Sequence, residues 1–82
     1  MFLQIIQALT EAKNRFVELE DTLQVAITLG TLTIPHHLEG NYDVVLQLLG
    51  QSREMLVELG EETRVEECED SIRMIQEDLA ES

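Results

Sequence analysis

Basic residues are scarce in this sequence. Five Lys and Arg side chains stand against 17 Asp and Glu side chains, so the formal net charge at pH 7 is −12. A protein that binds duplex nucleic acid normally presents a basic stripe to the phosphates. Anionic lipid surfaces attract basic segments in the same way. We therefore expect neither direct nucleic-acid binding nor attachment to a membrane surface.

Signals for export and for membrane insertion are also missing. The apolar N-terminal stretch MFLQIIQAL has no basic region and is soon followed by Glu11, so it does not resemble a secretory signal. No apolar run approaches the ~18 residues of a membrane span. The single cysteine, Cys68, has no partner for an internal disulfide, which is compatible with a reducing compartment. These features predict a cytoplasmic protein.

Residues that could carry chemistry are few. His36 and His37 are the two histidines, and the Glu-x-x-His pairs of helical di-metal sites are absent, so we interpret both as part of a solvated turn. Cys68 has acidic neighbours that oppose a thiolate, and we expect it to be a small buried core residue. No glycine is followed by a lysine, which argues against a phosphate-binding loop. We predict a protein without catalytic activity, metal or cofactor.

Helix breakers are rare as well, and this favours helical structure. The chain has one proline and four glycines, and its aromatic content of 4% requires an aliphatic core. Its length allows a single domain, 1–82. Apolar residues recur in steps of three and four, the spacing of an amphipathic helix. In the first part of the chain these are Phe2, Ile5, Leu9, Ala12, Phe16, Leu19, Leu23 and Ala26.

Local signals divide this pattern into helices. Glu20 and Asp21 can form a cap between two helices, and Asn41 can cap a third. Pro35 is expected to end or kink a helix near residue 34. Gly60 can end another helix in a left-handed conformation. We predict an all-α fold of about four helices in antiparallel hairpins, at roughly 2–19, 22–34, 41–59 and 62–80.

The chain also resembles itself at a distance of forty residues. The segment IIQALTEAKNRFVELEDTLQV (5–25) aligns with VLQLLGQSREMLVELGEETRV (45–65), and the matches include polar positions such as Gln7 with Gln47 and Glu18 with Glu58. Helical periodicity alone explains matching apolar positions, but it does not explain matching charges and amides. We interpret the chain as two helical-hairpin repeats, 1–40 and 41–82.

Residues 22–75 resemble a tetratricopeptide repeat of the longer bacterial type. The similarity rests on Leu29-Gly30, on Gly40-Asn41-Tyr42-Asp43 at the turn, and on Glu58-Leu59-Gly60-Glu61 at the end of the second helix. The sequence departs from the family pattern at Val45 and Ser52, where the family prefers alanine. A generic antiparallel helical bundle is the alternative. The resemblance implies that a ligand would lie against the first helix of each hairpin, where the candidate partner-binding residues are Gln24, Thr31, Arg64, Glu67 and Ser71.

These patterns favour a non-enzymatic protein-interaction module, an adaptor or regulator, whose partner is another protein. The apolar start of the chain, with Leu3 and Ile6 beside the first stripe, also predicts self-association as a homodimer or docking onto a larger protein. The alternative function is an acidic inhibitor or nucleic-acid-mimicking decoy, of the kind that phages use, which binds a basic protein surface. Its basis is the acidic run at 58–70, where seven carboxylates face one arginine.

Overall fold

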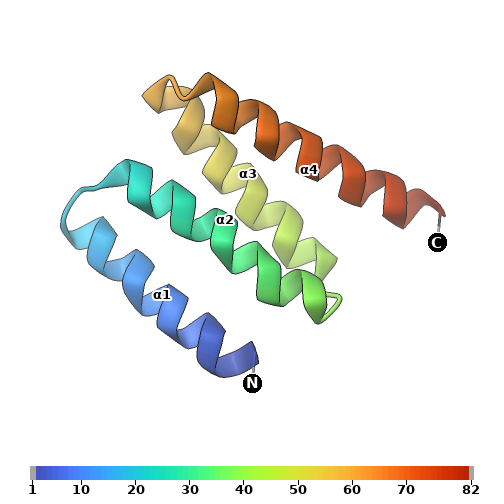
Figure 1. Cartoon of the computed structure of the whole chain (residues 1–82), viewed down its shortest axis with the longest axis horizontal. Helices are drawn as coiled ribbons and strands as arrows, with labels where there is room; N and C mark the ends of the chain where they lie inside the picture. The colour runs from blue at the N-terminus through green and yellow to red at the C-terminus, as the bar shows by residue number, and fades with distance from the viewer. Residues whose placement is uncertain (1, 82) are drawn as a thin grey trace.

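A computed structural model describes residues 2–81, and it confirms the all-α fold. The helices are α1 (Phe2–Glu18), α2 (Thr22–Leu38), α3 (Tyr42–Leu59) and α4 (Glu62–Glu81), and the described residues form no strand. Each helix packs against the next one in the chain, and successive helices run in opposite directions (Figure 1). The array is flat, measuring 41 × 33 × 14 Å. Helix α3 begins 40 residues after the start of α1, and α4 begins 40 residues after the start of α2.

The three turns between helices share one geometry, which explains why the chain reverses at each of them. Glu20, Gly40 and Gly60 have φ angles of 58°, 79° and 74° and lie twenty residues apart. The amide of each donates to the carbonyl three residues earlier, and the next amide donates to a carbonyl five residues before it. This is the Schellman pattern, which satisfies the last carbonyls of a helix and points the chain back.

The capping predictions can be compared with these turns. Asp21 is the N-cap of α2, and its side chain accepts a hydrogen bond of 3.2 Å from the amide of Gln24. Gly60 adopts the predicted left-handed conformation at the end of α3. Asn41 occupies the N-cap position of α3, but its side chain makes no capping hydrogen bond. The break at Glu20 and Asp21 therefore separates two helices, as predicted.

Glu20 is the one described non-glycine residue with a positive φ. A Cβ in the left-handed region costs roughly 1–2 kcal/mol, which glycine avoids. We expect Glu20→Gly to raise the free energy of unfolding by about 0.5–1 kcal/mol, the gain being reduced by glycine's larger unfolded-state entropy. Urea denaturation followed by circular dichroism measures this. Gly60→Ala, the reverse change at an equivalent turn, should lower stability by about 1 kcal/mol; a less stable Glu20→Gly would contradict the assignment of strain.

The prediction that the second helix ends near residue 34 was wrong. Helix α2 continues through Pro35 to Leu38, and Pro35 is buried inside its last turns. A proline has no amide proton, so it cannot donate the backbone hydrogen bond that another residue would make in a helix. Its carbonyl still accepts one, because the amide of Glu39 donates to the Pro35 carbonyl at 3.1 Å. Burial of the Pro35 ring and of Leu32 offsets the lost bond. His36 and His37 consequently lie in the last turn of α2, so the prediction that they belong to a turn between helices was wrong. His37 is exposed, as predicted, and His36 is half-buried.

The core is centred on α2 and α3. The buried residues Val25, Leu29 and Leu32 of α2 form one cluster, which side chains of both α1 and α3 cover. The second cluster joins α3 to α4 and consists of Val45, Leu49 and Ile75. Helix α1 contributes no buried residue and α4 contributes Ile75 alone. The outer helices therefore depend on α2 and α3 for their apolar contacts.

Helices α2 and α3 approach closely at one point. Ala26 is fully buried, and the hydroxyl of the buried Ser52 donates to the Ala26 carbonyl over 2.9 Å. Small side chains on both helices permit this contact. Cys68 of α4 lies next to it, with its Sγ 3.9 Å from the Ser52 Oγ, but Cys68 is half-buried, so the prediction of a buried core residue was wrong. The last helix covers this part of the core incompletely.

Candidate partner-binding groove

A groove runs between α2 and α4, and α3 forms its floor. It consists of two adjoining hollows of about 320 and 260 Å³. The hollows share Thr33, Ile34, Leu49 and Ser71, so they form one continuous surface. The groove exists because each helix contacts its neighbours in the chain, so α2 and α4 lie on either side of α3.

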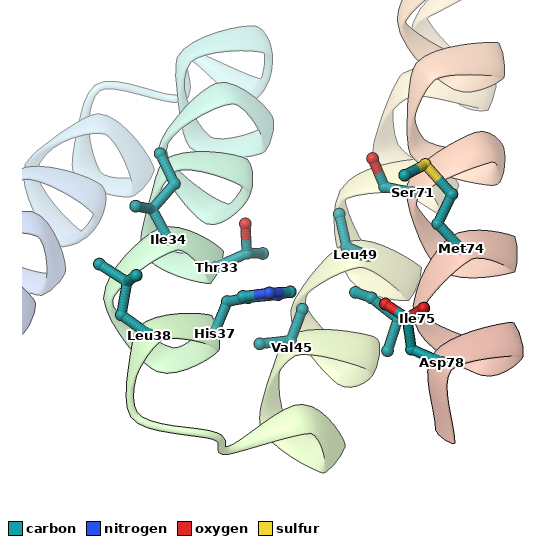
Figure 2. A pocket seen from close by; sticks show the side chains of 10 residues that line it. All are labelled: Thr33, Ile34, His37, Leu38, Val45, Leu49, Ser71, Met74, Ile75 and Asp78. Atoms are coloured by element: carbon teal, nitrogen blue, oxygen red, sulfur yellow. The ribbon is translucent and has the colours of Figure 1, made fainter. Parts of the chain in front are cut away.

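The larger hollow lies at the C-terminal end of α2 and is apolar. Figure 2 shows side chains of α2, α3 and α4 around it, with His37 directed toward Val45. Three large apolar side chains on its rim are exposed: Ile34 by 59%, Leu38 by 64% and Met74 by 62%. Val45, Leu49 and Ile75 form an apolar floor. A partner that covered this hollow would remove a contiguous apolar surface from water.

The smaller hollow collects most of the residues that the sequence singled out. Thr31 of α2 and Arg64, Glu67 and Ser71 of α4 line it, and all four are exposed. Gln24 lines neither hollow, because it lies in the first turn of α2 beside the Asp21 cap. The structure thus brings four of the five candidates together, and their role in binding a partner stays a prediction.

Sequence reasoning missed the apolar rim formed by Ile34, Leu38 and Met74. Helical periodicity assigns such residues to a core, and their exposure depends on which helices lie beside them. One signal was available: between Thr22 and Leu38 the sequence contains no Asp, Glu, Lys or Arg. A helix with apolar side chains on every face is normally covered on every face. In this chain α1 and α3 cover part of α2 and leave the groove side open.

Charge is low in the groove although it is high in the protein. The charged residues among its lining are Arg64, Glu67 and Asp78. One base and two acids give the groove a net charge of −1. Elsewhere on α4, Glu69 pairs with Arg53 of α3 at 2.9 Å, and Asp70 pairs with Arg73. The acidic side chains therefore lie mainly outside the groove.

The histidines do not form a metal site with their surroundings. His37 makes an edge-to-face contact with Tyr42, with ring centroids 5.3 Å apart. Within residues 2–81, no group of three or more His, Cys, Asp or Glu side chains could hold a metal ion. The contact between His37 and Tyr42 instead holds the end of α2 against the start of α3.

Comparisons with known proteins give no neighbour for this chain: no family model, no curated protein and no solved structure matches it. Among the described helices, none combines the length and the apolar character needed to cross a membrane. The groove is therefore interpreted from its own residues.

Proposed function

We propose that this protein is a non-enzymatic interaction module, an adaptor or regulator, and that the groove between α2 and α4 receives an apolar segment of a partner protein. The supporting observation is the exposed apolar rim of Ile34, Leu38 and Met74 around an apolar floor. Contiguous exposed apolar surface of this kind is typical of protein-binding sites.

The two hollows have different tasks in this proposal. The larger one supplies apolar contact area, which provides most of the affinity. In the smaller one, the hydroxyls of Thr31 and Ser71 and the charged groups of Arg64 and Glu67 offer hydrogen bonds and charge contacts that set the register of the partner. The combination fits an amphipathic helix or an extended segment with apolar side chains at its centre.

The resemblance to tetratricopeptide repeats agrees with this assignment. In the tetratricopeptide phase, which covers residues 22–75 and not the division into 1–40 and 41–82, α2 is the first helix of one hairpin and α4 is the first helix of the next. These two helices are the ones that line the groove. We propose that the chain is a repeat of this kind. The proposal for the groove does not depend on it, because the apolar rim is a property of these residues alone.

Met74→Glu tests the groove. The carboxylate would have to be desolvated against apolar groups when a partner binds, so we expect binding at least about ten-fold weaker, which corresponds to 1.4 kcal/mol. Immobilised wild-type protein and variants are incubated with host-cell extract, and the retained proteins are quantified by mass spectrometry. Val57→Glu is the matched control, because Val57 is also exposed (51%) but lines neither hollow.

The pattern of retained proteins decides the outcome. Proteins held by the wild type and by Val57→Glu but lost with Met74→Glu support the groove. An identical set on all three would contradict it, provided that circular dichroism shows equal helical content. Purified partners obtained in this way then allow a titration of Met74→Glu against the wild type.

The alternative function, an acidic decoy for a basic protein surface, draws on the acidic side chains of α4. Glu66, Asp70 and Glu77 are exposed on the outer side of this helix. Such binding is carried by exposed charges and should weaken steeply as ionic strength rises, because the Debye length falls from about 30 Å at 0.01 M to about 3 Å at 1 M. Binding in the apolar groove should change little over the same range.

A further inference from the structure

Helix α1 carries a second apolar stripe beside the one that packs on α2. Helix α1 packs on α2 through Ile6, Leu9 and Phe16. Ile5, Ala8 and Ala12 follow each other at intervals of three and four residues, so they share a side of the helix adjacent to the one that packs on α2. Leu19, in the turn directly after α1, follows Ala12 at an interval of seven residues. Ile5 is 43% exposed and Leu19 is 73% exposed. No described helix covers this side.

The equivalent side of α3 packs against another helix, α2. Helices α1 and α3 begin at Phe2 and Tyr42, so each position in α1 has a counterpart forty residues later. The counterparts of Ala8 and Ala12 are Leu48, which packs on the α2 cluster, and Ser52, which bonds to Ala26 of α2. The same side of α3 is therefore a helix-binding side, whereas in α1 Ile5 and Ala8 are exposed and Ala12 is half-buried.

The opposite edge of the array is built differently. On α4 the counterparts of Ala26, Gly30 and His37 of α2 are Glu66, Asp70 and Glu77, all exposed. Where α2 presents small or uncharged groups to α3, α4 presents carboxylates to water. Burying Glu66, Glu77 and the Asp70–Arg73 ion pair against the apolar side of another α1 would remove charged groups from water, which is strongly unfavourable. Head-to-tail association of α1 with α4 is therefore disfavoured.

The charge of α1 permits a different arrangement. Between Phe2 and Glu18 two bases (Lys13, Arg15) balance two acids (Glu11, Glu18), so the net charge is 0, whereas the remaining chain carries 3 bases and 15 acids and thus all of the −12. Two copies that meet through α1 bring neutral helices together and keep the acidic helices apart. The small side chains of Ala8 and Ala12 let the two helices approach closely.

We propose that a second copy of this chain docks on the apolar side of α1, giving a two-fold symmetric dimer in which α1 packs against α1 of the partner. One helix pair offers less than the ~1,200–2,000 Å² of a standard stable interface. The dimer is accordingly a weak one, which dissociates on dilution.

Sedimentation equilibrium of the full chain over about 1–500 µM tests the proposal. We expect the average mass to rise from that of the monomer toward twice that value. Ala8→Glu places a carboxylate in the middle of the apolar side and should weaken dimerisation at least ten-fold. Ala80→Glu, the same substitution at an exposed position on α4, is the matched control and should leave dimerisation unchanged.

Three results would overturn the proposal. The first is a wild-type protein that stays monomeric at the highest concentration. The second is a dimer that Ala8→Glu leaves intact, which would assign it to another surface. The third is a dimer that Ala80→Glu disrupts, which would indicate head-to-tail contact. Met74→Glu, tested in parallel, should remain dimeric. A result that contradicts partner binding in the groove can therefore be told apart from one that contradicts dimerisation through α1.

Discussion

Replacing Leu29 by alanine is expected to lower the free energy of unfolding by about 3–4 kcal/mol. Leu29 is 3% exposed, and its cluster on α2 is covered by side chains of both α1 and α3. The substitution removes apolar burial and leaves a cavity between three helices, and both effects lower stability. A domain of this size has a total stability of roughly 4–12 kcal/mol, so the substitution removes at least about a quarter of it.

Urea denaturation followed by circular dichroism measures this effect. Leu38→Ala is the matched control on the same helix, because Leu38 is 64% exposed and should change stability by less than about 0.5 kcal/mol. Equal losses for Leu29→Ala and Leu38→Ala would mean that α2 is not packed between α1 and α3 as described.

Ala26→Leu is expected to destabilise the protein by about 2–3 kcal/mol through the opposite defect, overpacking. Ala26 is fully buried where α2 meets α3, and the hydroxyl of Ser52 bonds to its carbonyl. A leucine side chain forces the two helices apart and weakens this bond, which contributes about 1 kcal/mol. The hydrogen bond is also buried, so its loss leaves the proton of the Ser52 hydroxyl without its acceptor.

Thermal unfolding and urea denaturation both report this change. Ala80→Leu makes the same substitution at an exposed position of α4 and should be nearly neutral. If Ala26→Leu were neutral as well, the close approach of α2 and α3 would be contradicted. Since a longer apolar residue keeps the hydrophobic pattern of the sequence, a loss of stability here would come from overpacking and from the weakened hydrogen bond between Ser52 and Ala26.

Several local features were readable from the sequence because their causes are local. The break between α1 and α2 follows from the capping carboxylate of Asp21, which needs only an amide three residues away. The end of α3 follows from Gly60, whose left-handed conformation depends on the missing Cβ. Together with these signals, intervals of three and four residues between apolar side chains predicted α1, α3 and α4 at nearly their observed lengths.

Features that depend on neighbouring helices were not readable. A proline tends to end a helix when no other contacts hold it, yet Pro35 lies within α2, where it is buried. Ile5 and Leu19 continue an apolar stripe but are exposed, because α2 covers one side of α1 and no described helix covers the other. The candidates Thr31 and Ser71 come from different helices, and only the packing of α2 and α4 on α3 places them in one hollow.

The sequence by itself determined that this protein is all-helical, where most of its helices begin and end, and that its acidic residues concentrate toward the second half. Those properties arise from backbone preferences, capping and side-chain charge within a few residues of each other. The tertiary structure alone decided which apolar side chains stay exposed, and thus located the groove and the open side of α1. Exposure depends on which helix lies next to which, and that arrangement depends on the packing of side chains far apart in the chain.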